Sequence, residues 1–167
     1  MRRLRWAPRY SRVNEVSIVE RLAANEAFSG ASVRALVPVC NAGEVVEVSP
    51  GETIIQEGQR NAWLYFVLDG QVEVYLPESS ERISAIRLAK REAGSCLGEY
   101  AFMDQEPASA AVVATKPSKL FRISHEALET LLKSHCALGR IVYRNLARKL
   151  SGRLRGSNAE LDLFRPM

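Results

Sequence analysis

The residues with the most specific chemistry form a short segment in the second half of the chain. Gly98 and Glu99 precede a small apolar stretch that includes Tyr100 and Ala101. A glycine before one turn of helix places free backbone N–H groups and the positive end of the helix dipole where a phosphate can bind. An ionised glutamate only accepts hydrogen bonds, so Glu99 suits a sugar hydroxyl rather than a phosphate. The segment therefore carries groups for both a phosphate and a sugar hydroxyl.

This segment resembles the phosphate-binding cassette of the cyclic-nucleotide-binding domain family. The family pattern is roughly aromatic-Gly-Glu-x-Ala-Leu, then a few variable residues, then Pro-Arg-Ala/Ser-Ala. Leu97 and Phe102 replace apolar residues by apolar residues, whereas Ala108 stands where the pattern has its one arginine. The resemblance implies that Glu99 holds the ribose 2′-hydroxyl and that the cation for the cyclic phosphate is missing. The ligand-binding residues that it implies are Gly98, Glu99, Tyr100, Ala101, Pro107, Ala108, Ser109 and Ala110.

A second block, over residues 45–75, supports the same family. Alternating β-branched, aromatic and polar residues predict strands, and Pro50-Gly51, Glu57-Gly58 and Asp69-Gly70 predict turns, the last of them a hairpin. The order and spacing of these turns resemble the β-roll of the family. This second block matters because a Gly-Glu pair with an apolar turn, taken alone, also occurs in ordinary protein cores. The predicted fold class is mostly β: an antiparallel, jelly-roll-like β-roll (a double-stranded β-helix) with N-terminal helices, a short cassette helix and a long C-terminal helix.

Helical periodicity flanks the predicted roll. Apolar residues recur at helical spacing within residues 14–40, with Ser32 as the N-cap of a second helix. From Ser124, another N-cap, they recur at intervals of three and four. Gly139 divides this run into predicted helices near residues 125–134 and 137–155.

Length and composition agree with one globular domain. The 167 residues are 47% hydrophobic and 25% charged, and no apolar run approaches the roughly 20 residues of a membrane span. The charged N-terminus does not read as a signal peptide, so a cytoplasmic protein is expected. The predicted organisation is a basic N-terminal arm over 1–13, a cyclic-nucleotide-binding-like domain over 14–155 and a tail over 156–167. Catabolite-activator-type regulators carry a DNA-binding domain after the long helix. The residues that follow the long helix here are too few for such a domain, so a stand-alone module is expected.

The cysteines and histidines do not predict a metal site. Cys40, Cys96 and Cys136 are odd in number and widely spaced, which indicates reduced packing residues. His125 and His135 are interpreted as a helix-surface pair without chemistry. No nucleophile, base and orienting residue form a recognisable arrangement, so neither an enzyme nor a resident cofactor is predicted.

The helix predicted over 137–155 is strongly basic. Arg140, Arg144 and Arg148 are spaced by four, and no acidic residue lies between positions 133 and 155. These charges indicate either a solvated face or a basic strip for an acidic protein, a nucleic acid or an anionic membrane. Nothing supplies base-reading geometry, so no specific DNA is expected. We expect instead a homodimer through this helix, with Leu138, Ile141 and Val142 facing the second copy. An unidentified protein partner is also expected.

Two functions remain open from the sequence. The first is a regulatory protein that senses cyclic AMP or cyclic GMP weakly, or an altered ligand; the alternative is a degenerate fold that acts as a protein-interaction or dimerisation module. A hydrogen bond to a charged group contributes about 1.5 to 3 kcal/mol, so losing the arginine weakens binding about ten- to a hundred-fold. Candidates for a replacement cation are Arg82, Arg87, Lys90 and Lys116.

Overall fold

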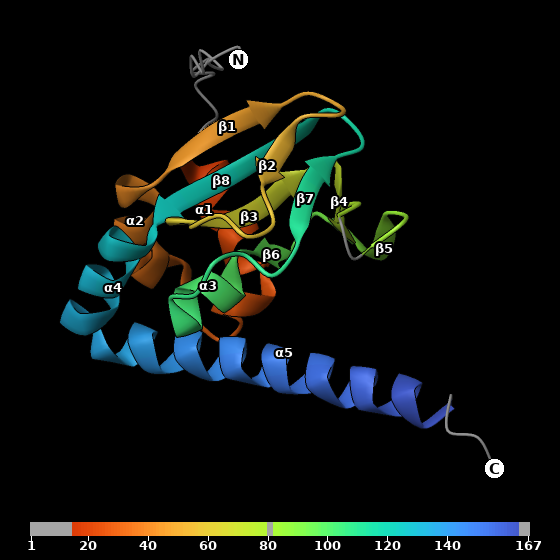
Figure 1. Ribbon diagram of the computed structural model, residues 1–167. Helices are drawn as coiled ribbons and strands as arrows, with labels where there is room; N and C mark the ends of the chain where they lie inside the picture. Colours follow the sequence, from red (N-terminus) through yellow and green to blue (C-terminus); the bar gives the residue numbers. More distant parts are fainter. Residues whose placement is uncertain (1–14, 80–81, 164–167) are drawn as a thin grey trace.

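Two antiparallel sheets make up the body of the protein (Figure 1). The structure is a computed structural model that describes residues 15–79 and 82–163, with side chains described for 18–79 and 82–156. The predicted N-terminal arm over 1–13 lies outside the described residues. The strands are β1 (Glu44–Val48), β2 (Thr53–Ile55), β3 (Trp63–Asp69), β4 (Gln71–Leu76), β5 (Ile86–Glu92), β6 (Cys96–Leu97), β7 (Ala111–Ala114) and β8 (Ser118–Ser124). They form the sheets β1-β8-β3-β6 and β2-β7-β4-β5, which confirms the predicted β-roll.

The Asp69-Gly70 turn differs from the prediction. Gly70 has φ 91°, and an added Cβ would lie 2.5 Å from the carbonyl oxygen of Pro117, so the turn needs glycine. The turn does not close a hairpin, because β3 and β4 belong to different sheets. Instead, it carries the chain from one sheet to the other. Strand β3 is buried on both faces over Leu64–Leu68. The chain therefore leaves the end of β3 in the interior and continues into the second sheet.

The helices are α1 (Glu15–Ala23), α2 (Val33–Ala42), α3 (Glu99–Asp104), α4 (His125–Ser134) and α5 (Cys136–Leu163), with a 3-10 turn η1 (Glu26–Phe28). Both predicted N-caps are confirmed: the Ser32 hydroxyl accepts the N–H of Ala35 at 3.3 Å, and the Ser124 hydroxyl accepts that of Ala127 at 3.2 Å.

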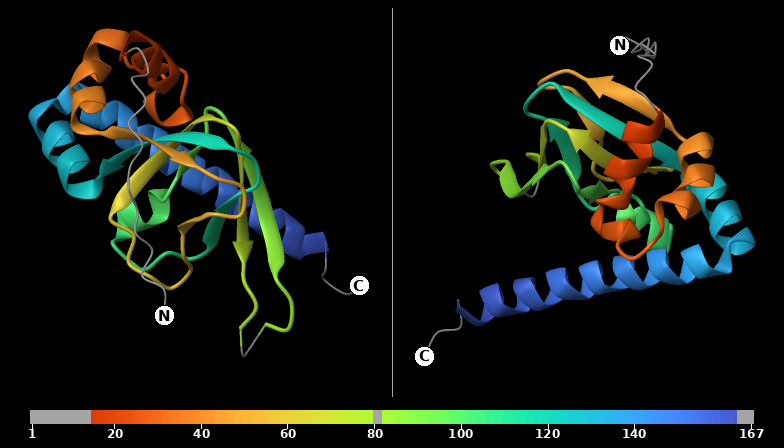
Figure 2. Two further views of the ribbon diagram at one scale, coloured as in Figure 1. Left: turned by 90° about the horizontal axis from the view of Figure 1, so that it is seen from above. Right: turned by 180° about the vertical axis from the view of Figure 1, so that it is seen from behind.

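The last helix is longer than predicted and continues over residues 156–163, where the sequence suggested a separate tail. Gly139 does not divide it. A Cβ at Gly139 would lie 2.7 Å from the carbonyl oxygen of Leu132, so this glycine lets α5 pass close to α4. Figure 2 shows that the C-terminal part of α5 projects beyond the roll.

The apolar core has two parts. One lies between the β1-β8-β3-β6 sheet and the helices and includes Phe28 and Phe66, with ring centroids 4.9 Å apart. The other fills the interior of the roll. Leu138 and Val142 are buried in the first part, at 3% and 0% exposure. The prediction that these two side chains face a partner is therefore wrong, because α5 uses them to cover its own domain.

The cysteine and histidine interpretations hold in part. Cys96 is buried, and burial raises the pKa of its thiol, but Cys136 is exposed rather than packed. His135 is exposed, whereas the half-buried His125 ring packs edge-on against Phe102 at 5.3 Å. The described residues include no cluster of metal-ligating side chains and no helix apolar and long enough to cross a membrane.

Candidate ligand-binding site

The tight turn at Gly98 positions the predicted cassette. Gly98 joins β6 to α3 with φ 83°, and an added Cβ would lie 2.6 Å from Asn61 Nδ2 and 2.8 Å from the carbonyl oxygen of Trp63. Asn61 is itself fixed, because its amide donates to that carbonyl at 2.7 Å. Only glycine fits this conformation and this space, so the first turn of α3 is held directly against the start of β3.

A cavity of about 360 Å³ opens beside this turn. The predicted residues that line it are Gly98, Glu99, Tyr100, Ala101, Ala108, Ser109 and Ala110. Pro107 does not line it and is exposed. Apolar side chains from β2, β4 and β7, among them Ile55, Val74 and Val112, form much of the remaining wall. The cavity thus has a cassette side with backbone N–H groups and an apolar side.

Ala108 belongs to the apolar interior rather than to a charged surface. Its side chain is 9% exposed and packs in the core of the roll. Its N–H donates to the carbonyl of Gln59 at 2.9 Å, and its carbonyl accepts the N–H of Gly58 at 2.8 Å. The cassette backbone is therefore held by the predicted turn at Glu57-Gly58, without a cation at position 108.

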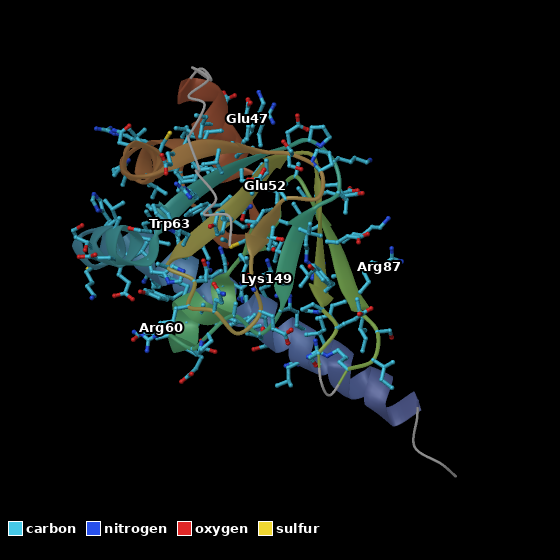
Figure 3. All side chains as sticks on the ribbon, turned by 45° about the horizontal axis from the view of Figure 1, so that its top comes forward. Glu47, Glu52, Arg60, Trp63, Arg87 and Lys149 are labelled. Carbon is cyan, nitrogen blue, oxygen red and sulfur yellow. The ribbon has the colours of Figure 1, made fainter. Side chains whose placement is uncertain are left out.

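Glu99 is buried at 2% exposure and is bound by the long helix. Its Oε1 lies 2.5 Å from Arg153 Nη1 and 3.4 Å from Lys149 Nζ. Lys149, which lies where α5 passes the roll (Figure 3), also pairs with Glu26 and donates to the carbonyl of Cys96 at 2.9 Å. The cassette carboxylate thus joins α3 to α5 electrostatically.

The sequence analysis did not predict this contact, because the basic residues of α5 were interpreted together as a single surface strip. Positions 142, 146, 149 and 153 share one helical face, spaced by four, three and four. Val142 and Leu146 on that face are buried, and their spacing could have indicated that Lys149 and Arg153 also point inward. Arg140, Arg144 and Arg148, on another face, are exposed.

The replacement cations suggested by the sequence do not reach the cavity. Arg82 pairs with Glu57 at 3.0 Å, and its hydrogen bond lowers the pKa of that carboxyl group. Arg87 projects outward from β5 (Figure 3) and lies 3.3 Å from Glu73. Lys90 and Lys116 are exposed and, like the two arginines, are not part of the cavity wall.

Arg91 and Arg153 are the arginines that line the cavity among the described residues. Arg91 lies on β5, opposite Val72 of β4. No sequence pattern singles out Arg91, because four charged residues occupy positions 87, 90, 91 and 92 and the β4–β5 ladder contains an irregularity. The alternation of side chains along β5 therefore does not predict which of its charged side chains faces the interior of the roll.

A second hollow, of about 460 Å³, lies at the edge between β1 and β2 and includes Tyr65 and Arg122. Burial raises the pKa of Tyr65. Arg122 donates to Glu44 at 2.8 Å through Nε, and its guanidinium lies 4.2 Å from the centre of the Trp63 ring. Its charge is thus already satisfied inside the protein, and the cassette cavity remains the candidate site.

Solved structures share this architecture. A cyclic nucleotide-binding domain from Methylobacillus flagellatus KT is 25% identical, with a TM-score of 0.76 over 92% of this chain and 85% of that one. The catabolite activator protein of Thermus thermophilus is also 25% identical, with a TM-score of 0.73 over 83% of this chain and 62% of that one.

Sequence relatives and a family model agree with the structures. A cGMP-dependent protein kinase of Plasmodium berghei is 30% identical over 108 residues, which are 65% of this chain and 11% of the kinase. A cAMP-dependent protein kinase regulatory subunit of Blastocladiella emersonii is 29% identical over 63% of this chain and 26% of the subunit. The chain thus spans only a small part of these relatives. The model of the cyclic nucleotide-binding domain matches residues 45–135, more than half of the chain, and the chain therefore belongs to the cyclic nucleotide-binding domain family.

Proposed function

We propose that this chain is a regulatory domain that binds a cyclic nucleotide, cyclic AMP or cyclic GMP, in the cavity beside α3. The observation that carries this proposal is the cavity itself, whose wall contains seven of the eight predicted cassette residues. Its volume of about 360 Å³ lies within the range of roughly 300 to 1,000 Å³ that small-molecule sites occupy. The relatives named for dependence on cyclic GMP and cyclic AMP support the ligand class.

Each part of the cavity has a role in this proposal. Glu99 accepts a hydrogen bond from a ribose hydroxyl beside its two cation contacts, because its buried Oε1 has no hydrogen-bond partner among the described residues and a carboxylate can accept several donors. The backbone around Ser109 and the Ser109 hydroxyl donate to the phosphate. Ile55, Val74 and Val112 pack against the base. The apolar packing contributes affinity, and the few polar groups fix the orientation of the ligand.

Affinity is expected to be low because position 108 offers no cation. One hydrogen bond to a charged group contributes about 1.5 to 3 kcal/mol, and about 1.4 kcal/mol corresponds to a factor of ten. Binding is therefore about ten to a hundred times weaker than in the same cavity with an arginine at position 108. A regulator of this kind responds only to high local concentrations of its ligand.

One observation favours the alternative, a degenerate domain that works through protein contacts. Glu99 already forms ion pairs with Arg153 and Lys149, so the carboxylate has a structural role without any ligand. In the alternative, these contacts are permanent and the cavity stays unused.

Amide chemical shifts measured during titration with cyclic AMP and cyclic GMP separate the two functions. We expect saturable shifts at Gly98, Glu99 and Ser109 that disappear in Ala89→Phe, which fills the cavity. Ile83→Phe, at a position that is 98% exposed, is the matched control and keeps the shifts. Wild-type protein without saturable shifts at millimolar nucleotide would favour the degenerate alternative.

A further inference from the structure

We infer that Arg91 is the residue that pairs with the anionic group of the ligand, in place of the cation missing at position 108. This inference rests on the proposed function, and it assigns the charge recognition of the cavity to β5 instead of the cassette. It also predicts which ligands the cavity prefers, namely those with a single negative charge over uncharged ones of the same shape.

The register of the sheet directs Arg91 inward. Arg91 lies opposite Val72 of β4, and Val72 is fully buried inside the roll. Residues directly opposite each other in an antiparallel pair place their side chains on the same face of the sheet. The Arg91 side chain accordingly lines the cavity, while Arg87 on the same strand is exposed and pairs with Glu73.

The guanidinium of Arg91 has unused donors in the described structure. Its Nε is buried and has no hydrogen-bond partner. Among the described residues, its side chain donates one hydrogen bond, from Nη1 to the carbonyl of Lys90 at 3.3 Å, and forms no ion pair. A buried donor without a partner is unfavourable, and a guanidinium carries five N–H donors suited to phosphate oxygens. The free donors of Arg91 can therefore bind the anionic group of a ligand.

Arg153, the other arginine of the cavity wall, is already committed. Its Nη1 lies 2.5 Å from the Glu99 carboxylate, and its guanidinium lies 5.6 Å from the centre of the Tyr100 ring. The Arg153 and Glu99 charges cancel, so the wall has the net positive charge of Arg91. A cyclic phosphodiester carries one negative charge and complements this wall, whereas a nucleoside does not.

Binding of cyclic AMP and of uncharged adenosine by matched variants tests this inference. Arg91→Met keeps the length of the side chain and removes its charge, while Arg87→Met does the same on the exposed face of the same strand. We expect Arg91→Met to weaken cyclic AMP binding about tenfold or more and to leave adenosine binding unchanged, with Arg87→Met like wild type. Arg91→Lys should retain part of the affinity for cyclic AMP.

Three results would overturn the inference. They are equal affinity of wild type for cyclic AMP and adenosine, unchanged cyclic AMP binding in Arg91→Met, and an equal loss for both ligands in that variant. Dimethyl phosphate, a monoanion without a nucleoside, separates this inference from the proposed function. If it shifts the Arg91 Nε–H signal while cyclic AMP does not bind, Arg91 is an anion site and the proposed function fails. If neither compound shifts that signal, the inference itself fails.

Discussion

At the scale of single residues, the proposed function makes Ala108 a position that limits how strongly the cassette would hold a phosphate. Ala108→Arg places a cation on the loop that lines the cavity, and we expect cyclic AMP affinity to rise about ten- to a hundred-fold. Calorimetry measures this change. Met103→Arg adds the same charge on the exposed side of α3 and serves as the control. No gain for Ala108→Arg would mean that the cavity lacks more than this one charge.

Gly98 and Gly94 provide a matched pair for the geometry of the turn. Both have positive φ, at 83° and 89°, but only Gly98 has neighbours within 4 Å of an added Cβ. Gly94→Ala should cost roughly 1 to 2 kcal/mol through backbone strain alone. Gly98→Ala adds a clash and should cost roughly 2 to 4 kcal/mol. Urea unfolding measures both changes in the free energy of unfolding, and equal losses would contradict the close approach at Gly98.

His125 should make stability depend on pH. Burial lowers its pKa below the ordinary value of 6.5, and the backbone hydrogen bond with Trp63 and the nearby Glu129 oppose this in part. Because the unfolded chain binds the proton more tightly, the contribution of neutral His125 is present above about pH 6.5 and is lost as pH falls toward its folded pKa. The free energy of unfolding measured from about pH 7 to 5 should fall less in His125→Gln than in wild type. His135→Gln, at an exposed position, should behave like wild type.

At residue scale, the sequence predicted most of the cassette residues that line the cavity but not the arginines beside them. Gly98 and Ala108 lie where the motif predicts, because turn chemistry and small-residue patterns are local. The sequence did not predict Arg91 and Arg153 in the cavity wall, because their positions depend on sheet register and on the face that α5 presents. Such contacts arise between residues far apart in the chain, and local spacing does not encode them.

At the scale of elements, the ion pairs of Glu99 connect α3 to α5. Arg153→Met removes a cation from a buried carboxylate and should destabilise the protein by about 1 to 3 kcal/mol. Hydrogen exchange in α5 beyond Lys149 should become faster, because the roll then holds this part less strongly. Arg155→Met, at an exposed position, is the control. Unchanged exchange in Arg153→Met would show that apolar packing alone holds the helix.

Prediction succeeded for most elements and failed where an element is buried on both faces. The helices after Ser32 and Ser124 begin where their N-caps indicate. In β3, however, Leu64 and Phe66 face the helical core while Tyr65 and Val67 face the interior of the roll. With apolar residues on both faces, alternation does not reveal which neighbour the strand pairs with, and the Asp69-Gly70 turn was misread as a hairpin.

At the scale of the whole molecule, the exposed part of α5 predicts a homodimer with a different seam from the one first expected. Leu138 and Val142 are covered by the domain, whereas Leu154 is 64% exposed. Positions 147, 150 and 154 hold Ala, Leu and Leu, with the three- and four-residue spacing of a coiled-coil seam. Light scattering should show a dimer that Leu154→Asp dissociates and Ser151→Asp does not. A monomeric wild type at micromolar concentration would contradict this seam.

Calorimetric titration of the wild-type protein with cyclic AMP and cyclic GMP tests the central claim most directly. The cavity supplies Glu99 and the cassette backbone but no cation at position 108. We therefore expect saturable binding of one nucleotide per chain, with a Kd between about 10 µM and about 1 mM. Sub-micromolar binding would contradict the role assigned to the missing arginine. Absence of any saturable heat at millimolar ligand would contradict a nucleotide-sensing function altogether.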